Sequence, residues 1–236
     1  MVPEVEMESM SYTAYSDFIK SHTVIAEPDS NAKLVTKVGK NISDAIVKYL
    51  KEHGQSKRVA GYSWEFKLVQ DNEVNAWCMP GGKVVVYSAL MPVTKDEDGL
   101  AVVLGHEIAH AIARHGNERM SEQLMIQTGG KVLAVAMASN PAQTQQIFNQ
   151  LYGTGTGLGA LAYSRKHESE ADKLGLCFMA MAGYDPQKAV AFWERMIALN
   201  PSQPMQILST HPNDATRIAD IKKFMPTALK YYKVKA

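Results

Sequence analysis

The sequence predicts an α+β fold that is mainly helical and carries one small, mostly antiparallel sheet. Two observations predict it. Apolar residues recur at helical spacing before residue 54 and again from about residue 97 onward. Between these regions the pattern changes to period two, which is typical of strands with one buried face. Helices and strands are thus segregated along the chain, and we expect a single helices-plus-sheet domain.

The composition is that of an ordinary globular protein. The 236 residues are 46% hydrophobic and 21% charged, and the net charge is +1. Such a chain buries a sizeable core, and its composition argues against disorder. The absence of a basic stripe argues against a nucleic-acid partner. No stretch approaches the roughly 20 apolar residues of a membrane span, and the N-terminus lacks a signal-peptide pattern, so we expect a soluble chain. Oligomeric state is not indicated.

Two helices are predicted before the sheet. The first carries an apolar series at helical spacing: Tyr12, Tyr15, Phe18 and Ile19. The second begins at Asp29 or Ser30 and ends at Gly54. We therefore divide the chain into an N-terminal helical extension, residues 1–28, and a single domain, residues 29–236.

Three strands are predicted next, at residues 64–68, 74–79 and 83–87, the last two joined by a tight turn at residues 80–82. A glycine-rich break at residues 153–159 and a proline segment at 201–204 interrupt the later helices. The glycine break is either a flexible connection or a mobile flap near an active site. Cys78 and Cys177 are too few for a disulfide framework, and we expect two buried free thiols rather than one bridge.

Residues 97–115 form the predicted helix that carries the chemistry. Residues 94–97 resemble a capping box, and Gly116 suits the position just past the helix end. His106 and His110 are four residues apart, so a rotation of about 400° places both imidazoles on one line, able to bind one cation. Glu107 projects about 100° away, where it can reach a water without competing as a ligand. This is the His-Glu-x-x-His motif of zinc peptidases. The alternative is two packed histidines flanking a solvated glutamate.

A catalytic zinc site needs a third protein ligand and an open fourth position. Ala113 and Gly116 exclude the extended motif with a third histidine on the same helix, and residues 129–130, both glycine, exclude a glutamate at the thermolysin-like spacing. The next donors are Glu168 and Asp172, which are again four apart on one helical face. Glu168 can ligate the metal, while Asp172 accepts a hydrogen bond from a ligand histidine. The alternative is an acidic run that only faces water.

These paired motifs resemble peptidase family M48, which includes the HtpX, CAAX prenyl protease and BepA-like branches. The likeness covers roughly residues 30–225 and extends to Asn75-Ala76-Trp77, to residues 80–82 and to Thr210-His211-Pro212 with Arg217. It implies a zincin-like (gluzincin) fold and one zinc ion per chain, held by His106, His110 and Glu168.

The resemblance also implies roles for other residues. Asp172 would support a ligand histidine from behind. Arg217 would orient Asp172 or the substrate, unless it only forms a surface or structural salt bridge. Asn75, Ala76 and Trp77 would line the cleft as a strand that pairs with an extended substrate. His211 would stabilise the oxyanion or cap the zinc in a latent state, unless it is only a histidine in a helix-entry turn.

The function that follows is zinc-dependent endopeptidase activity on polypeptides, including misfolded envelope proteins. Because spans are missing, the chain resembles the soluble branch, whose members are exported to the periplasm or held at the outer membrane as lipoproteins. Two alternatives stay open. One is an exopeptidase that recognises a free terminus; the other is a latent or non-catalytic zinc-bound protein that binds misfolded polypeptides.

Several residues near the motifs receive ordinary interpretations. His115, beside Arg114 at a helix end, is expected to interact with the helix dipole rather than with the metal. Glu170 is expected to be a surface charge, and Trp193 a core residue. His167 has no second donor at ligand spacing.

Overall fold

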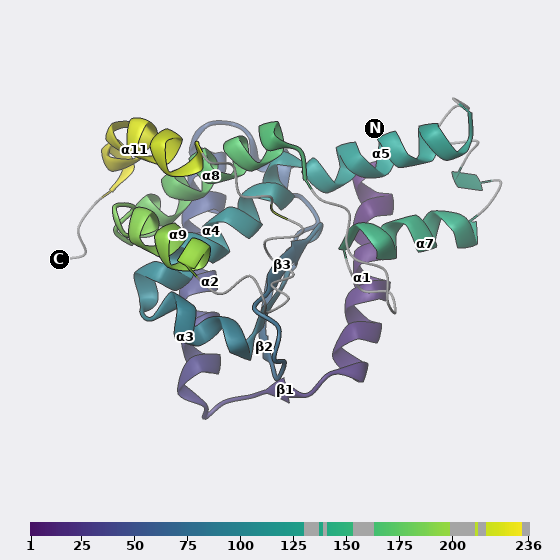
Figure 1. Cartoon of the computed structure of the whole chain (residues 1–236). Coiled ribbons are helices and arrows are strands. Elements are labelled where there is room, and N and C mark those ends of the chain that lie inside the picture. Colours follow the sequence, from purple (N-terminus) through teal and green to yellow (C-terminus); the bar gives the residue numbers. More distant parts are fainter. Residues whose placement is uncertain (130–136, 139–140, 153–162, 199–210, 212–215, 233–236) are drawn as a thin grey trace.

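The structure, a computed structural model, describes residues 1–129, 137–138, 141–152, 163–198, 211 and 216–232. In this part of the chain, four strands form a sheet in the order β1-β2-β4-β3, with helices on both faces (Figure 1). The strands are β1 (Val24–Ile25), β2 (Glu65–Val69), β3 (Ala76–Met79) and β4 (Lys83–Tyr87). The helices are α1 (Glu4–Ser21), α2 (Ser30–Glu52), α3 (Met91–Thr94), α4 (Glu97–Ala113), α5 (His115–Gln127), α7 (Pro141–Tyr152), α8 (Arg165–Met181), α9 (Lys188–Ala198) and α11 (Arg217–Ala228). The mainly helical α+β prediction is confirmed.

The sheet is mixed. β1 pairs antiparallel with β2, and β3 pairs antiparallel with β4. The five-residue pairing of β2 with β4 is parallel, which the period-two pattern did not indicate. The turn between β3 and β4 contains Gly81 and Gly82, both at positive φ, where glycine has no steric penalty. In the strand order β1-β2-β4-β3, β3 lies at the edge of the sheet.

Each face of the sheet packs against its own set of helices. Successive side chains of a strand point to opposite faces, so Ala76 and Cys78 join the core formed with α2, α4 and α8. Trp77 points the other way, where Tyr15 and Phe18 of α1 meet its ring edge-on. Helices α5 and α7 extend this second core beside α1 (Figure 1).

Helices α4 and α8 approach each other closely at a pair of glycines. A Cβ atom on Gly105 would lie 2.8 Å from the carbonyl oxygen of Gly175. A Cβ atom on Gly175 would lie 2.8 Å from the backbone nitrogen of His106. Because backbone meets backbone, larger residues at either position would separate the helices. The crossing brings the first turn of α8, which begins after the N-cap Ser164, close to the histidines of α4.

The ends of α4 differ from the prediction. Its N-cap is Asp96, whose carboxylate accepts a hydrogen bond from the Gly99 backbone N–H at 2.8 Å, so the capping-box prediction for residues 94–97 is wrong. At the other end, Arg114 adopts left-handed φ and ψ of 65° and 30°, and α5 starts at the next residue. Gly116 consequently lies inside α5, where a side chain would collide with the hydroxyl of Tyr152.

Three remaining expectations concern membrane spans, cysteines and breaks. Among the described residues, no helix combines the length and apolar character needed to traverse a bilayer. Cys78 and Cys177 are both buried and free, as expected. The glycine-rich break at 153–159 and the segment at 201–204 lie outside the described residues.

Candidate metal centre

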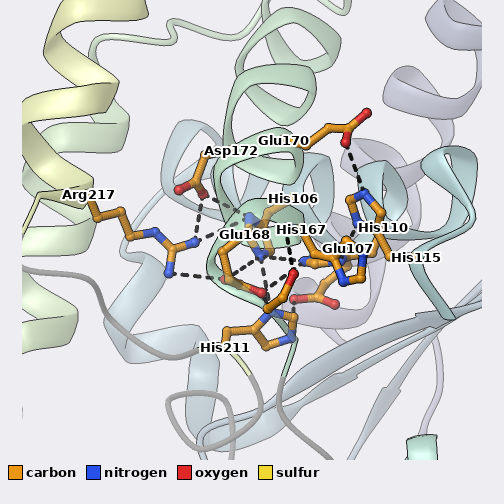
Figure 2. Close-up of polar contacts among 11 residues, drawn as sticks. His106, Glu107, His110, His115, His167, Glu168, Glu170, Asp172, His211 and Arg217 are labelled. Atoms are coloured by element: carbon orange, nitrogen blue, oxygen red, sulfur yellow. Dashed lines mark hydrogen bonds and ion pairs between the residues drawn. The ribbon is translucent and has the colours of Figure 1, made fainter. Parts of the chain in front are cut away.

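Four buried side chains converge beside the α4–α8 crossing (Figure 2). They are His106, His110, Glu168 and His211. One donor atom from each lies within 4.8 Å of all the others. The Nε2 atoms of His106 and His110 are 3.1 Å apart, and His211 Nδ1 lies 3.1 Å from His106 Nε2 and 2.9 Å from a Glu168 oxygen. The two helical motifs therefore meet at one point, together with His211 from later in the chain.

The spacing of these donor atoms suits a zinc ion. In a tetrahedral site with ligand bonds of about 2.0–2.1 Å, neighbouring ligand atoms are roughly 3.3 Å apart. The separations within the cluster, including 3.3 Å between His110 Nε2 and Glu168, fall around that value. Imidazole nitrogens and a carboxylate oxygen are also the donors that zinc takes in proteins. The residues present thus fit the metal by both geometry and chemistry.

Glu107 and Glu168 have opposite electrostatic environments although both are buried. Burial raises the pKa of Glu107, against the opposing charges of His211 and His106. Burial acts in the same sense on Glu168, but the charges of His211 and His106 outweigh it and lower the pKa of Glu168 below its ordinary value. One Glu107 oxygen lies 3.5 Å from His211 Nε2. The pair thus consists of one carboxylate suited to holding a proton and one that stays ionised.

Asp172 and Arg217 contact the Nδ1 side of His106, and Arg217 also lies 3.4 Å from Glu168. The carboxylate of Asp172 accepts a hydrogen bond from His106 Nδ1 at 2.9 Å and one from Arg217 Nη2 at 2.6 Å. Burial opposes ionisation of Asp172, but the charge of Arg217 outweighs it and lowers the pKa of Asp172. The guanidinium of Arg217 also lies 3.4 Å above the ring of Trp193. Trp193 is a core residue, as expected, and it also contacts this network.

His115 contacts His110, the other histidine of the α4 motif, and the sequence did not single out this contact. Its Nδ1 lies 2.9 Å from His110 Nδ1, and His115 itself is not among the four residues of the donor cluster. Burial, with the nearby charge of His167, lowers the pKa of His115 to about 4. Glu170, expected to be an ordinary surface charge, reaches to 3.5 Å from His115 Nε2. Helical periodicity could not pair residues 110 and 115, because the helix breaks between them.

Tyr163 is a second residue that sequence reasoning missed. Its ring stacks on His110 with centroids 4.0 Å apart and lies 5.2 Å from the ring of His211. The guanidinium of Arg119 sits 4.1 Å from its centroid. No motif marks Tyr163; its only signal is a position directly before the Ser164 that caps α8.

The predicted substrate strand lies beside α4, but its side chains do not all face the site. Asn75 accepts a backbone hydrogen bond from Tyr87, and Ala76 packs toward α4. Trp77 faces α1, so its ring is part of the opposite core and not of the metal centre. β3 is the last strand in the sheet order, so one side of its backbone does not pair with another strand among the described residues.

Comparison with known proteins gives a consistent result. The model for peptidase family M48 matches residues 38–225. The mitochondrial metalloendopeptidase OMA1 of Schizosaccharomyces pombe is 38% identical over 167 residues, covering 70% of this chain and 48% of that protein. OMA1 of Saccharomyces cerevisiae is 35% identical over 180 residues, covering 73% and 50%. The beta-barrel assembly-enhancing protease of Escherichia coli is 34% identical over 167 residues, covering 67% and 34%. The chain thus spans about half the length of the first two relatives and a third of the last.

Proposed function

This chain belongs to peptidase family M48, and from that premise we propose that it is a zinc-dependent metalloendopeptidase acting on protein substrates. The observation that carries the proposal is the convergence of His106, His110 and Glu168 with the buried Glu107 beside them. These three residues would hold one zinc ion. When bound, zinc polarises the scissile carbonyl and lowers the pKa of the attacking water.

Glu107 is the proposed general base. It takes a proton from the attacking water and later returns it to the leaving amine. Its raised pKa supports the second half of this role, because a carboxyl group that holds a proton more readily is a better acid toward the amine. The charge-paired Glu168 is unsuited to proton transfer, since its lowered pKa favours permanent ionisation.

His211 supports two roles that lead to different functions. From its position beside Glu107 it could donate a hydrogen bond to the oxyanion of the tetrahedral intermediate. Its Nδ1, however, lies within the donor cluster, 3.1 Å from His106 Nε2. A fourth protein ligand closes a zinc site, whereas catalysis needs that position open. The second candidate is therefore a latent zinc-bound state that binds misfolded polypeptides without cleaving them.

The substrate and location are the further parts of the proposal. The edge of β3, residues 75–77, offers backbone groups to an extended polypeptide, as in strand addition to a sheet. We place the protein in quality control of envelope proteins, exported to the periplasm or attached to the outer membrane. The support is the Escherichia coli relative, named for enhancing β-barrel assembly. The yeast relatives are named as mitochondrial, so the proposed envelope location rests on the bacterial relative alone.

A substitution at Glu107 tests the activity. Glu107→Gln should keep about one zinc per chain yet lower cleavage of an unfolded protein substrate roughly 10²–10⁴-fold. Glu194→Gln, the same change at an exposed position of α9, should leave cleavage unchanged. Full activity of zinc-loaded Glu107→Gln would overturn the assignment. In parallel, His211→Ala should raise cleavage if His211 caps the site and lower it if His211 stabilises the oxyanion.

A further inference from the structure

The outer nitrogen of each α4 histidine is held by a different kind of group. His106 Nδ1 donates to the carboxylate of Asp172, a common arrangement behind a metal ligand. His110 Nδ1 instead faces another imidazole, Nδ1 of His115, at 2.9 Å (Figure 2). Both rings are almost fully buried, with 2% of His110 and 1% of His115 exposed. Water therefore does not take part in this contact, and the two nitrogens must satisfy each other.

The position of the proton in this contact follows from the orientation of His110. Its Nε2 points into the cluster, 3.1 Å from His106 Nε2 and 3.3 Å from Glu168. A neutral imidazole that offers the lone pair of Nε2 carries its proton on Nδ1. His110 is then the donor and His115 Nδ1 the acceptor. The proton of His115 must sit on its Nε2, which faces the Glu170 carboxylate at 3.5 Å.

The backbone is shaped to permit this contact. In an uninterrupted helix, residue 115 would lie about 140° around the axis from residue 110. Arg114 breaks the helix in a left-handed conformation, which is unfavourable for a residue other than glycine. The break turns His115 back toward His110, and the ring of His167 stacks on it at 4.5 Å and 21°. The strained backbone at Arg114 thus has a structural effect: it orients the imidazole of His115 toward His110.

We propose that His115 is a positioning residue for the metal ligand His110, whose Nδ1 proton it accepts. The inference rests on the proposed function, because it takes His110 as a zinc ligand. It makes His115 the counterpart of Asp172: each fixes the tautomer and the orientation of one histidine.

Matched substitutions at His115 separate the acceptor nitrogen from the ring. His115→Phe keeps a ring to stack on His167 but leaves His110 Nδ1 without an acceptor. His115→Asn loses the ring but restores an amide oxygen close to the position of Nδ1. Zinc affinity, measured by competition with a chromophoric chelator, should fall about 10–100-fold in His115→Phe and only a few-fold in His115→Asn. His167→Phe, which alters the stacked neighbour, should bind zinc like the unaltered chain.

A spectroscopic readout guards against a merely structural effect. In the zinc-loaded chain, ¹⁵N NMR of the imidazoles should show His110 protonated at Nδ1 and His115 protonated at Nε2 only. Circular dichroism of the metal-free variants establishes that each is folded. The inference fails if His115→Phe binds zinc as tightly as the unaltered chain, or if His115 carries its proton on Nδ1. Failure of the unaltered chain to bind zinc would instead overturn the proposed function.

Discussion

At the scale of single residues, the metal centre separates two glutamates by their surroundings rather than by their chemistry. Glu168 faces imidazoles and lies 3.4 Å from Arg217, so its ionised form is favoured despite burial. Glu107 is equally enclosed, but the burial effect dominates and raises its pKa. A buried carboxylate that is ionised at pH 7, such as that of Glu107, lowers the free energy of unfolding.

Glu107→Gln should stabilise the metal-free protein. A raised pKa in the folded state means that stability falls as the pH rises above the unfolded value near 4.5, so at pH 7 the ionised carboxylate is a cost. An amide of the same shape removes it. We expect the free energy of unfolding to rise on the order of 1 kcal/mol, seen as a thermal midpoint about 2–4 °C higher. Glu194→Gln, at an exposed position of α9, serves as the control, and a lower midpoint for Glu107→Gln would contradict the prediction.

Asp172→Asn should act in the opposite direction and depend on pH. The pKa of Asp172 is lowered, so its stabilising effect is present above the unfolded value near 3.9 and is lost as the pH falls through the folded value. Removing one partner of the buried pair with Arg217 should cost about 3 kcal/mol at pH 7. Urea unfolding at pH 7 and near pH 3 measures this, with the exposed Asp220→Asn as control. An equal loss at both pH values would speak against it.

Some residues of the site could be predicted from their spacing along the sequence, and others could not. Glu168 and Asp172 could be singled out because four residues separate them, and a helix repeats almost at that interval. His115 could not, because the left-handed Arg114 interrupts the helix and no glycine marks the break. Tyr163 reaches His110 only through the tertiary fold, so no pattern in its neighbours indicates it.

At the scale of elements, the crossing of α4 and α8 sets the distance between the carboxylate and the imidazoles. Glu168 is in the first turn of α8, and Gly175 lies about two turns later, against Gly105 of α4. The glycine contact fixes how near the two axes come. The length of the Glu168 side chain suffices to reach His110 only because the helices are that close.

Gly175→Ala should therefore impair the site although it touches no ligand. Alanine favours a helix over glycine by about 1 kcal/mol, but its methyl group would meet the backbone of α4, which cannot move aside alone. We expect a net loss of about 1–3 kcal/mol from overpacking, together with weaker zinc binding. Thermal unfolding and chelator competition measure the two effects. Lys173→Ala, an exposed change two residues earlier, is the control; a more stable Gly175→Ala with normal zinc affinity would refute the argument.

The sheet shows what periodicity can and cannot predict about elements. Alternation identified the strand that became β2, whereas β3 and β4 were predicted from valine-rich composition and the Pro-Gly-Gly turn between them; both are buried along their whole length. Alternation could not indicate that β2 runs parallel to β4, since the direction of pairing is decided between distant segments. β1, with two residues, is too short to carry any period.

At the scale of the whole molecule, the donor set joins three separate parts of the chain. His106 and His211 are 105 positions apart in the sequence, and Glu168 and His211 are 43 apart. An unfolded chain does not hold these groups together, so zinc binds the folded state in preference. Metal binding and folding are then linked by mass action.

Removing the metal should destabilise the protein without unfolding it. The described residues form two hydrophobic cores, and these should hold the fold together when the ion is absent. With free zinc at about 100 times its dissociation constant, linkage predicts about 2.7 kcal/mol of stabilisation, or roughly 5–10 °C in thermal midpoint. Differential scanning calorimetry with and without a chelator measures the shift. His106→Ala should abolish it, and a midpoint insensitive to chelator in the unaltered chain would contradict the linkage.

The contact between Gly105 and Gly175 also restricts which sequences can carry this site. In most helix pairs a larger residue on one helix can be offset by a smaller residue on the other. A damaging substitution can then be rescued by a second substitution at the facing position. Here both positions already hold the smallest residue, and each faces backbone rather than a side chain. In a random library selected for recovery of Gly175→Ala, rescuing changes should therefore arise elsewhere along α4 or α8, and never at position 105. Neither glycine can be replaced by a larger residue, whatever occupies the other position.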